Sequence, residues 1–274
     1  MTHDIRDRIF ESLSGQRFSA TVVVDEAGIV AGVSGALSEA MAVGCSAQPL
    51  VADGDSVEAG AKLIELIGAP KELAITEECV IGALAKPSGI ATATRQLVDA
   101  ARPHLQVVGG GWKKMPSVMR EMVRHAVTVG GAQSTIDDAP FLYLDKNYVR
   151  IFGGVAATLE AVDSMTEFRK VIQVGDDDCS LEEDTRTAVE YGVSTIFVDS
   201  GDMADLSCVI DMLEELSARD RTRVAFGGGI RLDRIDDLVR LGVDALCIGR
   251  AIVDAPLLDM RMEVEYAKTR ANAR

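Results

Sequence analysis

Hydrophobic positions in the first quarter of the chain form short groups separated by turn residues. An amphipathic pattern predicts a helix over residues 4–13, and a Val-rich run predicts a strand over residues 19–25. Residues 29–43 repeat Ala, Leu and Met with the period of a helix, which we expect to end at Gly44. Between residues 49 and 68, short apolar runs alternate with Asp-Gly and Ala-Gly turns. This pattern is typical of a small β-rich unit.

From residue 76 onward, helical patterns alternate with short β-branched runs. The helices are expected over residues 76–85, 90–101, 117–128, 158–170, 180–191, 203–217 and 232–241. The strands are expected over residues 105–108, 148–151, 170–174, 195–198, 223–226 and 245–248. This alternation indicates βαβ units and a parallel sheet, and the length of the segment favours an incomplete α/β barrel. An open doubly wound sheet is the alternative.

Composition excludes several classes of function. The 274 residues carry a net charge of −15, from 43 acidic and 28 basic side chains, which is a poor match to the phosphate backbone of nucleic acid. The apolar runs are far shorter than the roughly 18–20 residues that a membrane span needs. Five scattered cysteines argue for reduced thiols and against a disulfide framework or a zinc site. We therefore expect a cytoplasmic protein that binds neither nucleic acid nor membrane.

Two strands that run into glycines indicate a phosphate site. The strand at 223–226 leads into three glycines, and the strand at 245–248 leads into a further one. Backbone without side chains lets N–H groups approach an anion, and the last two units of many α/β barrels hold a phosphate in this way. Tight turns without a ligand are the alternative. The candidate phosphate ligands are Gly227, Gly228, Gly229, Gly249 and Arg250.

Charged residues at other strand ends extend this site. Asp199 directly follows the strand at 195–198, where a carboxylate could hold Mg²⁺ or a sugar hydroxyl, or simply cap a helix. Lys113 and Lys114 follow three glycines and could bind an anionic substrate, with a solvated loop as the alternative. Residues 176–178 are three aspartates, which fit a solvated loop better than a metal site. His104 and His125 are interpreted as structural.

A resemblance to a known family enters at residues 87–95, which read Pro-Ser-Gly-Ile-Ala-Thr-Ala-Thr-Arg. This segment closely resembles the opening of the barrel in the quinolinate phosphoribosyltransferase family, and the later glycine junctions fall in that family's order. The resemblance implies an α/β sandwich over residues 1–100, with 255–274 as a candidate addition, and an incomplete barrel over 101–254. It also implies a homodimer or higher homo-oligomer, a phosphate-bearing small-molecule substrate, and Mg²⁺ used with phosphoribosyl pyrophosphate.

The resemblance assigns roles to individual positions and also shows departures. Lys113, Lys114, Asp199 and Lys146 match catalytic positions, with Asp199 also the candidate metal ligand. Substrate-binding positions fall on Arg95, Glu78, Ser134, Thr135 and Gln173. Several of these depart from the family pattern: glutamate replaces arginine at Glu78, Ser134-Thr135 stands for a His-Arg pair, and lysine is displaced by one residue at Lys146. Gln173 stands near the position of a family glutamate.

These departures remove positive charges that a pyridine dicarboxylate would need, since an unpaired buried charge costs several kcal/mol. We therefore expect a phosphoribosyltransferase that acts on a nitrogen heterocycle other than quinolinate. Two alternatives remain: a lyase or isomerase that uses the same phosphate site with Asp199 or Lys146 as proton carrier, and a non-catalytic ligand-binding homologue.

Overall fold

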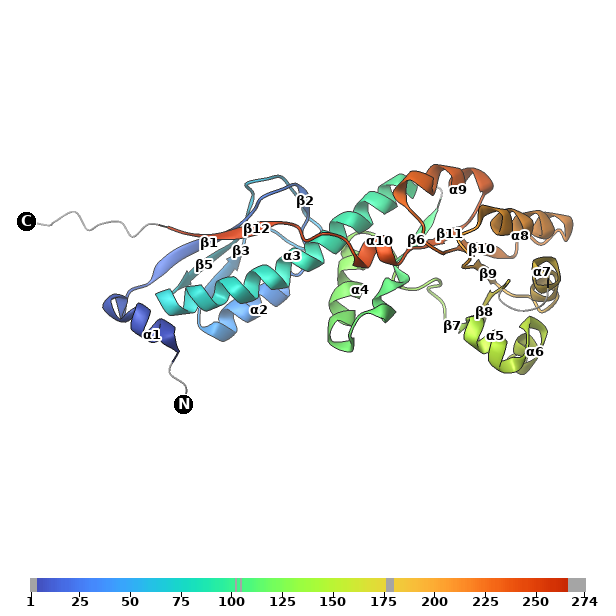
Figure 1. Cartoon of the computed structure of the whole chain (residues 1–274), viewed down its shortest axis with the longest axis horizontal. Helices are drawn as coiled ribbons and strands as arrows, with labels where there is room; N and C mark the ends of the chain where they lie inside the picture. The colour runs from blue at the N-terminus through green and yellow to red at the C-terminus, as the bar shows by residue number, and fades with distance from the viewer. Residues whose placement is uncertain (1–3, 102, 104, 176–179, 266–274) are drawn as a thin grey trace, which may run out of the picture. The chain divides into compact units, whose positions relative to one another are not determined.

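A computed structural model describes residues 4–101, 103, 105–175 and 180–265, and Figure 1 shows its elements. The chain packs into two compact units. The first contains the residues up to Arg95, the segment 117–130 and the residues from Ala255 on. The second contains residues 96–116 and 131–254. The fold is α/β, with antiparallel sheets in the first unit and a parallel half-barrel in the second, as the sequence predicts.

The first unit is built on a four-stranded antiparallel sheet in the order β12-β1-β5-β3. These strands are β1 (Phe18–Val24), β3 (Ser46–Pro49), β5 (Lys62–Gly68) and β12 (Met260–Val264). A two-stranded ribbon joins β2 (Gly28–Ile29) to β4 (Ser56–Val57). The helical elements are α1 (Ile5–Ile9), η1 (Glu11–Leu13), α2 (Val33–Val43), α3 (Pro70–Ala101), η3 (Ser117–Met119) and α4 (Arg120–Val129), and α3 continues into the second unit. Strand β12 pairs with β1 so that Val22 lies opposite Met262.

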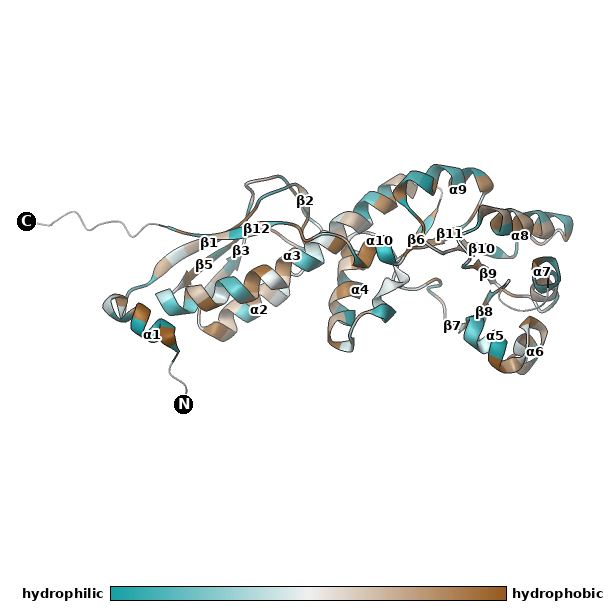
Figure 2. Ribbon diagram, viewed as in Figure 1, coloured by the Kyte–Doolittle hydropathy of each residue, from teal (hydrophilic) through white to brown (hydrophobic). Residues whose placement is uncertain are grey.

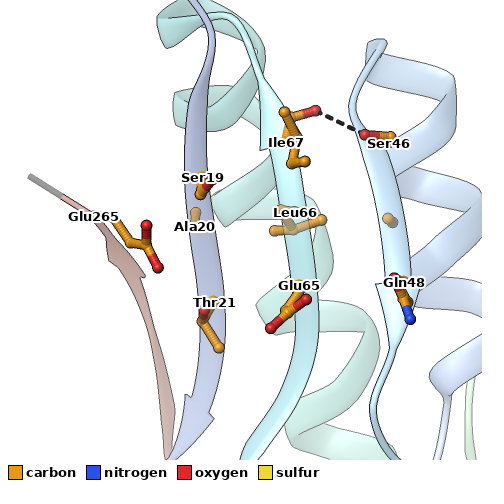
Figure 3. A pocket seen from close by; sticks show the side chains of 10 residues that line it. Ser19, Ala20, Thr21, Ser46, Gln48, Glu65, Leu66, Ile67 and Glu265 are labelled. Atoms are coloured by element: carbon orange, nitrogen blue, oxygen red, sulfur yellow. Dashed lines mark hydrogen bonds between the residues drawn. The ribbon is translucent and has the colours of Figure 1, made fainter. Parts of the chain in front are cut away.

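The core of this unit lies between the sheet and its helices. Alternate residues of β1 and residues of α3 spaced by four or seven belong to one buried cluster, as the periods of strand and helix require. They are Ala20, Val22, Val24, Leu73, Val80 and Leu84. Figure 2 shows the same periodicity as brown and teal patches that alternate along α3. The sheet also has a polar surface, where Ser19, Gln48 and Glu65 are exposed and line a shallow hollow of about 340 Å³ (Figure 3).

The second unit is a six-stranded parallel sheet in the order β6-β11-β10-β9-β8-β7. The strands are β6 (Gln106–Val108), β7 (Phe141–Leu144), β8 (Arg169–Gln173), β9 (Thr195–Val198), β10 (Arg223–Phe226) and β11 (Ala245–Cys247). The helical connections are η2 (Gly110–Lys114), α5 (Lys146–Phe152), α6 (Val155–Ala161), α7 (Leu181–Glu190), α8 (Met203–Glu215), η4 (Leu232–Arg234), α9 (Ile235–Leu241) and α10 (Arg250–Val253). Gln133 forms a parallel bridge to Val108 and so extends the sheet beyond β6.

Four local expectations were wrong. Residues 148–151 lie in α5, because Asp145 caps this helix by accepting hydrogen bonds from the N–H groups of Asn147 (2.9 Å) and Tyr148 (3.4 Å). The strand lies earlier, in β7. The helix expected over 158–170 ends at Ala161, and residues 28–29 form β2 before α2 begins at Val33.

The fourth difference is that α3 continues through Pro87 where the sequence predicts two helices. Proline removes one helical hydrogen bond, but tertiary contacts hold this turn in place. The Ser88 hydroxyl accepts a hydrogen bond from the N–H of Ala31 (3.0 Å) and the Ala31 carbonyl lies 3.2 Å from the same oxygen. Thr92 accepts a hydrogen bond from the N–H of Ile29 (2.8 Å). The residues that carry the family resemblance therefore join α3 to the loop before α2.

Candidate active site

The carboxyl ends of the parallel strands bring together a carboxylate, a thiol, an ammonium group, a phenol and a glycine. Asp199 follows β9, Gly227 follows β10, and Cys247 ends β11. Lys113 lies in η2 after β6, and Tyr143 lies near the end of β7. Because all strands run in the same direction, these positions meet at one edge of the sheet, where α/β barrels hold their active sites.

Gly227 allows Asp199 and Phe197 to approach the β10 loop. A Cβ atom at Gly227 would lie 2.6 Å from Oδ1 of Asp199 and 2.9 Å from Cζ of Phe197. Any side chain at this position would displace the carboxylate or the ring. The glycine is thus required by the site's own side chains, and this contact fixes the place of Asp199 beside the loop.

Gly228 packs against the loop that follows β9. Its φ angle is +99°, and a Cβ atom there would lie 2.3 Å from the backbone nitrogen of Gly201. Gly201 in turn has a φ of +72°, and its N–H donates a hydrogen bond to the carbonyl of Gly227 (3.0 Å). The loops after β9 and β10 therefore pack backbone against backbone. Gly228 is needed for this packing, whereas a Cβ atom at Gly229 would have no atom within 4 Å.

A second pair of glycine loops is packed in the same way. A Cβ atom at Gly111 would lie 2.9 Å from the carbonyl oxygen of Gly249 and 2.7 Å from Cγ1 of Val253. Gly249 itself has space, since its Cβ atom would approach only the Cα of Gly111, at 3.8 Å. The loop that carries Lys113 is thereby held against the loop after β11.

Within the described part of the chain, the backbone N–H groups of Gly228 and Gly229 form no hydrogen bond.

The electrostatics of the site follow from burial and from two opposite charges. Burial raises the pKa of the Cys247 thiol to about 12, with Asp199 adding to the rise and Lys113 opposing it. Burial also raises the pKa of the Tyr143 phenol, and Cys247, Asp199 and Asp145 add to the rise. Both groups are therefore neutral near pH 7. A neutral thiol is a weak nucleophile, so Cys247 serves as a small apolar wall.

The remaining predicted residues of this unit lie around the site. The backbone N–H of Lys146 donates a hydrogen bond to Oε1 of Gln173 (3.2 Å), which joins the start of α5 to the end of β8. Trp112 donates a hydrogen bond from Nε1 to the carbonyl of Ser134 (3.2 Å). The side chains of Lys113, Lys114, Thr135, Lys146 and Arg250 are exposed, and Arg250 pairs with Asp254 at 3.3 Å.

Two predicted residues lie in the first unit. Nε of Arg95 donates a hydrogen bond to the carbonyl of Gly130 (3.0 Å), so its guanidinium caps the end of α4. Glu78 pairs with Arg6 at 2.7 Å. His125 Nε2 lies 2.6 Å from Oδ2 of Asp53, a contact that supports its structural interpretation. Both Arg95 and Glu78 thus make defined contacts within the unit that carries them.

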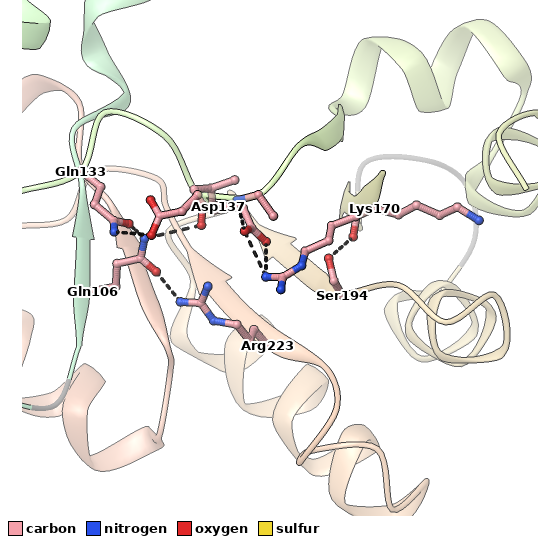
Figure 4. Close-up of polar contacts among 10 residues, drawn as sticks. Gln106, Gln133, Asp137, Lys170, Ser194 and Arg223 are labelled. Atoms are coloured by element: carbon pink, nitrogen blue, oxygen red, sulfur yellow. Dashed lines mark hydrogen bonds and ion pairs between the residues drawn. The ribbon is translucent and has the colours of Figure 1, made fainter. Parts of the chain in front are cut away.

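Sequence reasoning missed a polar network at the opposite end of the half-barrel (Figure 4). Arg223 bonds to Gln106, and Gln106 bonds to Gln133. Asp137 is buried and pairs with Arg169 at 3.1 Å. These residues line a hollow of about 430 Å³ near the amino ends of the strands. Because side chains there stabilise the barrel and do not carry its chemistry, the network is structural.

Asp199 is the residue predicted to hold a metal ion. Among the described residues, no group of three or more His, Cys, Asp or Glu side chains could hold a metal ion. Residues 176–178 and His104 lie outside the described residues. Asp199 is an exposed carboxylate at the site, and one carboxylate suffices when Mg²⁺ arrives with a phosphate ligand.

The described helices include none that is long and apolar enough to cross a membrane.

Comparison with known proteins places this geometry in a family. Residues 7–88 match the model of the quinolinate phosphoribosyl transferase N-terminal domain, and residues 90–263 match that of its C-terminal domain. A probable nicotinate-nucleotide pyrophosphorylase [carboxylating] of Methanothermobacter thermautotrophicus is 26% identical over 258 residues, which cover 93% of this chain and 91% of the relative. The human nicotinate-nucleotide pyrophosphorylase [carboxylating] is 26% identical over 232 residues, covering 82% and 74% of the two chains.

Solved structures show the same fold. NadC from Streptococcus pyogenes superposes with a TM-score of 0.81 at 22% identity, covering 97% of this chain and 92% of that one. Nicotinate-nucleotide pyrophosphorylase from Pyrococcus furiosus gives a TM-score of 0.80 at 20% identity, covering 96% and 75% of the two chains. The two domain matches together span nearly the whole sequence and confirm the resemblance of residues 87–95. The chain therefore belongs to the quinolinate phosphoribosyltransferase family, whose members are phosphoribosyltransferases.

Proposed function

We propose that this chain transfers ribose 5-phosphate from phosphoribosyl pyrophosphate to the ring nitrogen of a heterocycle other than quinolinate. Family membership supports the reaction type. The observation that carries the proposal is the meeting of Lys113, Asp199 and the packed glycine loops at one end of the half-barrel. Lys113 and Asp199 supply opposite charges, and the loops supply backbone N–H groups.

The 5′-phosphate belongs, in this proposal, at the loops of Gly229 and Gly249. Both positions leave space where a Cβ atom would stand, and N–H groups without side chains can reach phosphate oxygens. Gly228 contributes indirectly, because its contact with Gly201 sets the path of the loop. In this proposal, binding of the phosphate thus depends on backbone geometry more than on any side chain.

The transfer step needs stabilisation of a leaving anion. The lone pair of the ring nitrogen forms the bond to C1′ while the bond from C1′ to pyrophosphate oxygen breaks and its electrons leave with the pyrophosphate. Negative charge grows on the pyrophosphate and positive charge grows on the ribose. The Lys113 ammonium would stabilise the first charge and the Asp199 carboxylate the second. Mg²⁺, when carried in on the pyrophosphate, would neutralise further charge, with Asp199 as its protein contact.

The positive charges near the site determine which heterocycle can act as the acceptor. Quinolinate carries two carboxylates, and each needs a cationic partner when it is taken out of water. The expected family cations are replaced at Glu78, Ser134 and Thr135, and Glu78 already pairs with Arg6. Lys113 and Lys114 are the lysines in η2 beside the site. A neutral, amine-bearing or singly charged ring fits this balance better than a dicarboxylate.

Pyrophosphate release tests the proposal. The chain is incubated with phosphoribosyl pyrophosphate, Mg²⁺ and one of quinolinate, nicotinate, nicotinamide or 3-aminopyridine, and pyrophosphate and nucleotide are measured together. Release with a ring other than quinolinate, and its loss in Lys113→Ala, is the expected result. Turnover of quinolinate on the order of 1 s⁻¹ or faster, an ordinary enzymatic rate, would overturn the choice of acceptor. Thermal stabilisation by ribose 5-phosphate without turnover of any ring would instead indicate a ligand-binding homologue.

A further inference from the structure

Tyr143 places an aromatic ring inside the half-barrel, just below the charged groups of the site. It is the third residue of β7 and packs against the inner cluster that contains Val171 and Ala225. Its ring lies 6.0 Å from that of Phe197, centroid to centroid, at an interplanar angle of 45°. Two aromatic rings from β7 and β9 therefore form one wall of the interior, and the Gly227 contact places Asp199 at the edge of that wall.

The face of the Tyr143 ring already holds a cation, the ammonium of Lys113. Nζ of Lys113 lies 5.6 Å from the ring centroid, over the ring, and the Lys113 side chain is exposed. The face of an aromatic ring carries negative potential and attracts cations within about 6 Å. The position of Lys113 thus marks the side of the ring that a ligand at the strand ends would meet.

Negative groups around Tyr143 strengthen this preference. Asp199 and Asp145 are close enough to oppose ionisation of the phenol, and they raise its pKa together with burial and Cys247. A carboxylate brought next to the ring would meet the same repulsion. A flat cation would meet attraction from the ring and from both carboxylates, and it would be repelled by the Lys113 ammonium until that group turns to the anionic part of the ligand.

The proposed transfer creates such a cation. When a pyridine nitrogen bonds to C1′, the ring becomes a pyridinium and carries a positive charge. We propose that Tyr143 is a specificity residue that binds the face of the heterocycle and favours the positively charged pyridinium of an N-ribosylated nucleotide. This inference rests on the proposed function, because it names the ring that occupies the same site.

A matched pair of ligands tests the inference. Nicotinamide mononucleotide and benzamide riboside 5′-phosphate have the same shape and differ in the ring atom, N⁺ or C, that bears the ribose. Ribose 5-phosphate serves as the ligand without a ring. Affinities are measured by calorimetry and by the fluorescence of Trp112, the one tryptophan of the sequence, whose indole contacts the Ser134 backbone. We expect the pyridinium nucleotide to bind the wild-type chain about 5- to 30-fold more tightly than its uncharged analogue, as for a desolvated cation–π contact.

Variants then assign the preference to Tyr143. Tyr143→Phe keeps the ring and should keep the preference, whereas Tyr143→Leu should abolish it and leave ribose 5-phosphate affinity within about twofold. Tyr191→Leu, at the end of α7, is the matched control that should change neither. Equal affinities of the two nucleotides in the wild type, or an undiminished preference in Tyr143→Leu, would overturn the inference. The wild-type comparison decides the matter even when Tyr143→Leu does not fold.

The two proposals can fail separately. A wild-type chain that discriminates between the two nucleotides through Tyr143 but releases no pyrophosphate with any ring would refute phosphoribosyl transfer and leave the role of Tyr143 intact. A chain that releases pyrophosphate but does not discriminate between the nucleotides would do the reverse. A chain that binds none of the three ligands would refute both.

Discussion

Replacing Gly228 or Gly229 by alanine distinguishes two effects on stability, the loss of backbone packing and the strain of a left-handed backbone conformation. The two neighbours have similar φ angles, +99° and +82°, in the left-handed region. They differ in surroundings: a Cβ atom at Gly228 would lie 2.3 Å from the Gly201 nitrogen and 2.7 Å from its Cα, whereas a Cβ atom at Gly229 meets nothing within 4 Å. We predict that Gly228→Ala destabilises the barrel unit markedly more than Gly229→Ala.

The expected difference can be estimated from these contacts. A non-glycine residue in the left-handed region costs roughly 1–2 kcal/mol of folding free energy, and both variants incur this cost. The methyl group at Gly228 adds an overpacking cost of about 1–3 kcal/mol, because the atoms it meets are backbone and cannot rotate away. The change in unfolded-state entropy is common to both and cancels. The free energies of unfolding should therefore differ by about 1–3 kcal/mol.

Thermal unfolding followed by Trp112 fluorescence measures this difference, since Trp112 lies in the barrel unit. Each kcal/mol shifts the midpoint by about 2–4 °C in a unit of this size. Gly242→Ala is the control, with a φ of +80° and open space around its Cβ atom, and should resemble Gly229→Ala. Equal midpoints for Gly228→Ala and Gly229→Ala would refute the packing that joins the β9 and β10 loops.

Four other predictions concern the site, the network and the assembly. Gly249→Val should fold, because φ is −110° and its Cβ atom has space, but should bind ribose 5-phosphate at least about tenfold more weakly in calorimetry. Lys113→Ala should weaken phosphoribosyl pyrophosphate binding by about 1–3 kcal/mol and ribose 5-phosphate binding less. Burial opposes ionisation of Asp137, but the Ala139 N–H and Arg169 outweigh it and hold its pKa below the ordinary value. The ionised Asp137 therefore stabilises the fold at pH values above the unfolded-state pKa of about 3.9, and this stabilisation is lost as pH falls. The melting temperature of Asp137→Asn should accordingly drop less between pH 6 and pH 3 than that of the wild type. Sedimentation should show a dimer at micromolar concentration, and a stable folded monomer would contradict the family arrangement.

The central strands of the parallel sheet were predictable because they are buried on both faces. Residues 195–198 and 223–226 each hold three consecutive apolar residues after one polar residue, and they match β9 and β10 in full. Local sequence failed where tertiary contacts decide the conformation. The Pro87 turn is held in the helix by hydrogen bonds between Ser88 and Ala31, 57 residues apart. The local sequence around one residue of such a contact does not indicate which distant residue is its partner. The run at 148–151 is a different case, because its helix is set by a local signal, the N-cap Asp145, that outweighs the β-branched residues.

The sequence indicated the strand ends that carry the candidate site, but not the contacts that their residues make. Glycines after β10 and β11 indicated a phosphate loop, yet the sequence could not show that Gly228 faces Gly201, 27 residues earlier. Tyr143 and Phe197 looked like ordinary core residues because their pairing depends on the registers of three strands. Arg223 and Gln106 are 117 residues apart in sequence, and they meet because β11 pairs with both β6 and β10.

The pairing of β12 with β1 has a consequence for biosynthesis. β1 is synthesised before the other strands, and one of its edges pairs with β5. Its other edge pairs with residues 260–264, which leave the ribosome after the whole half-barrel. Until then β1 presents unpaired N–H and carbonyl groups of a hydrophobic strand, the kind of edge that recruits strands from other chains. The half-barrel can meanwhile close from contacts within its own contiguous stretch of strands. We expect the nascent chain to be most prone to aggregation in this interval, and a chaperone that covers this edge to act until β12 has paired with β1.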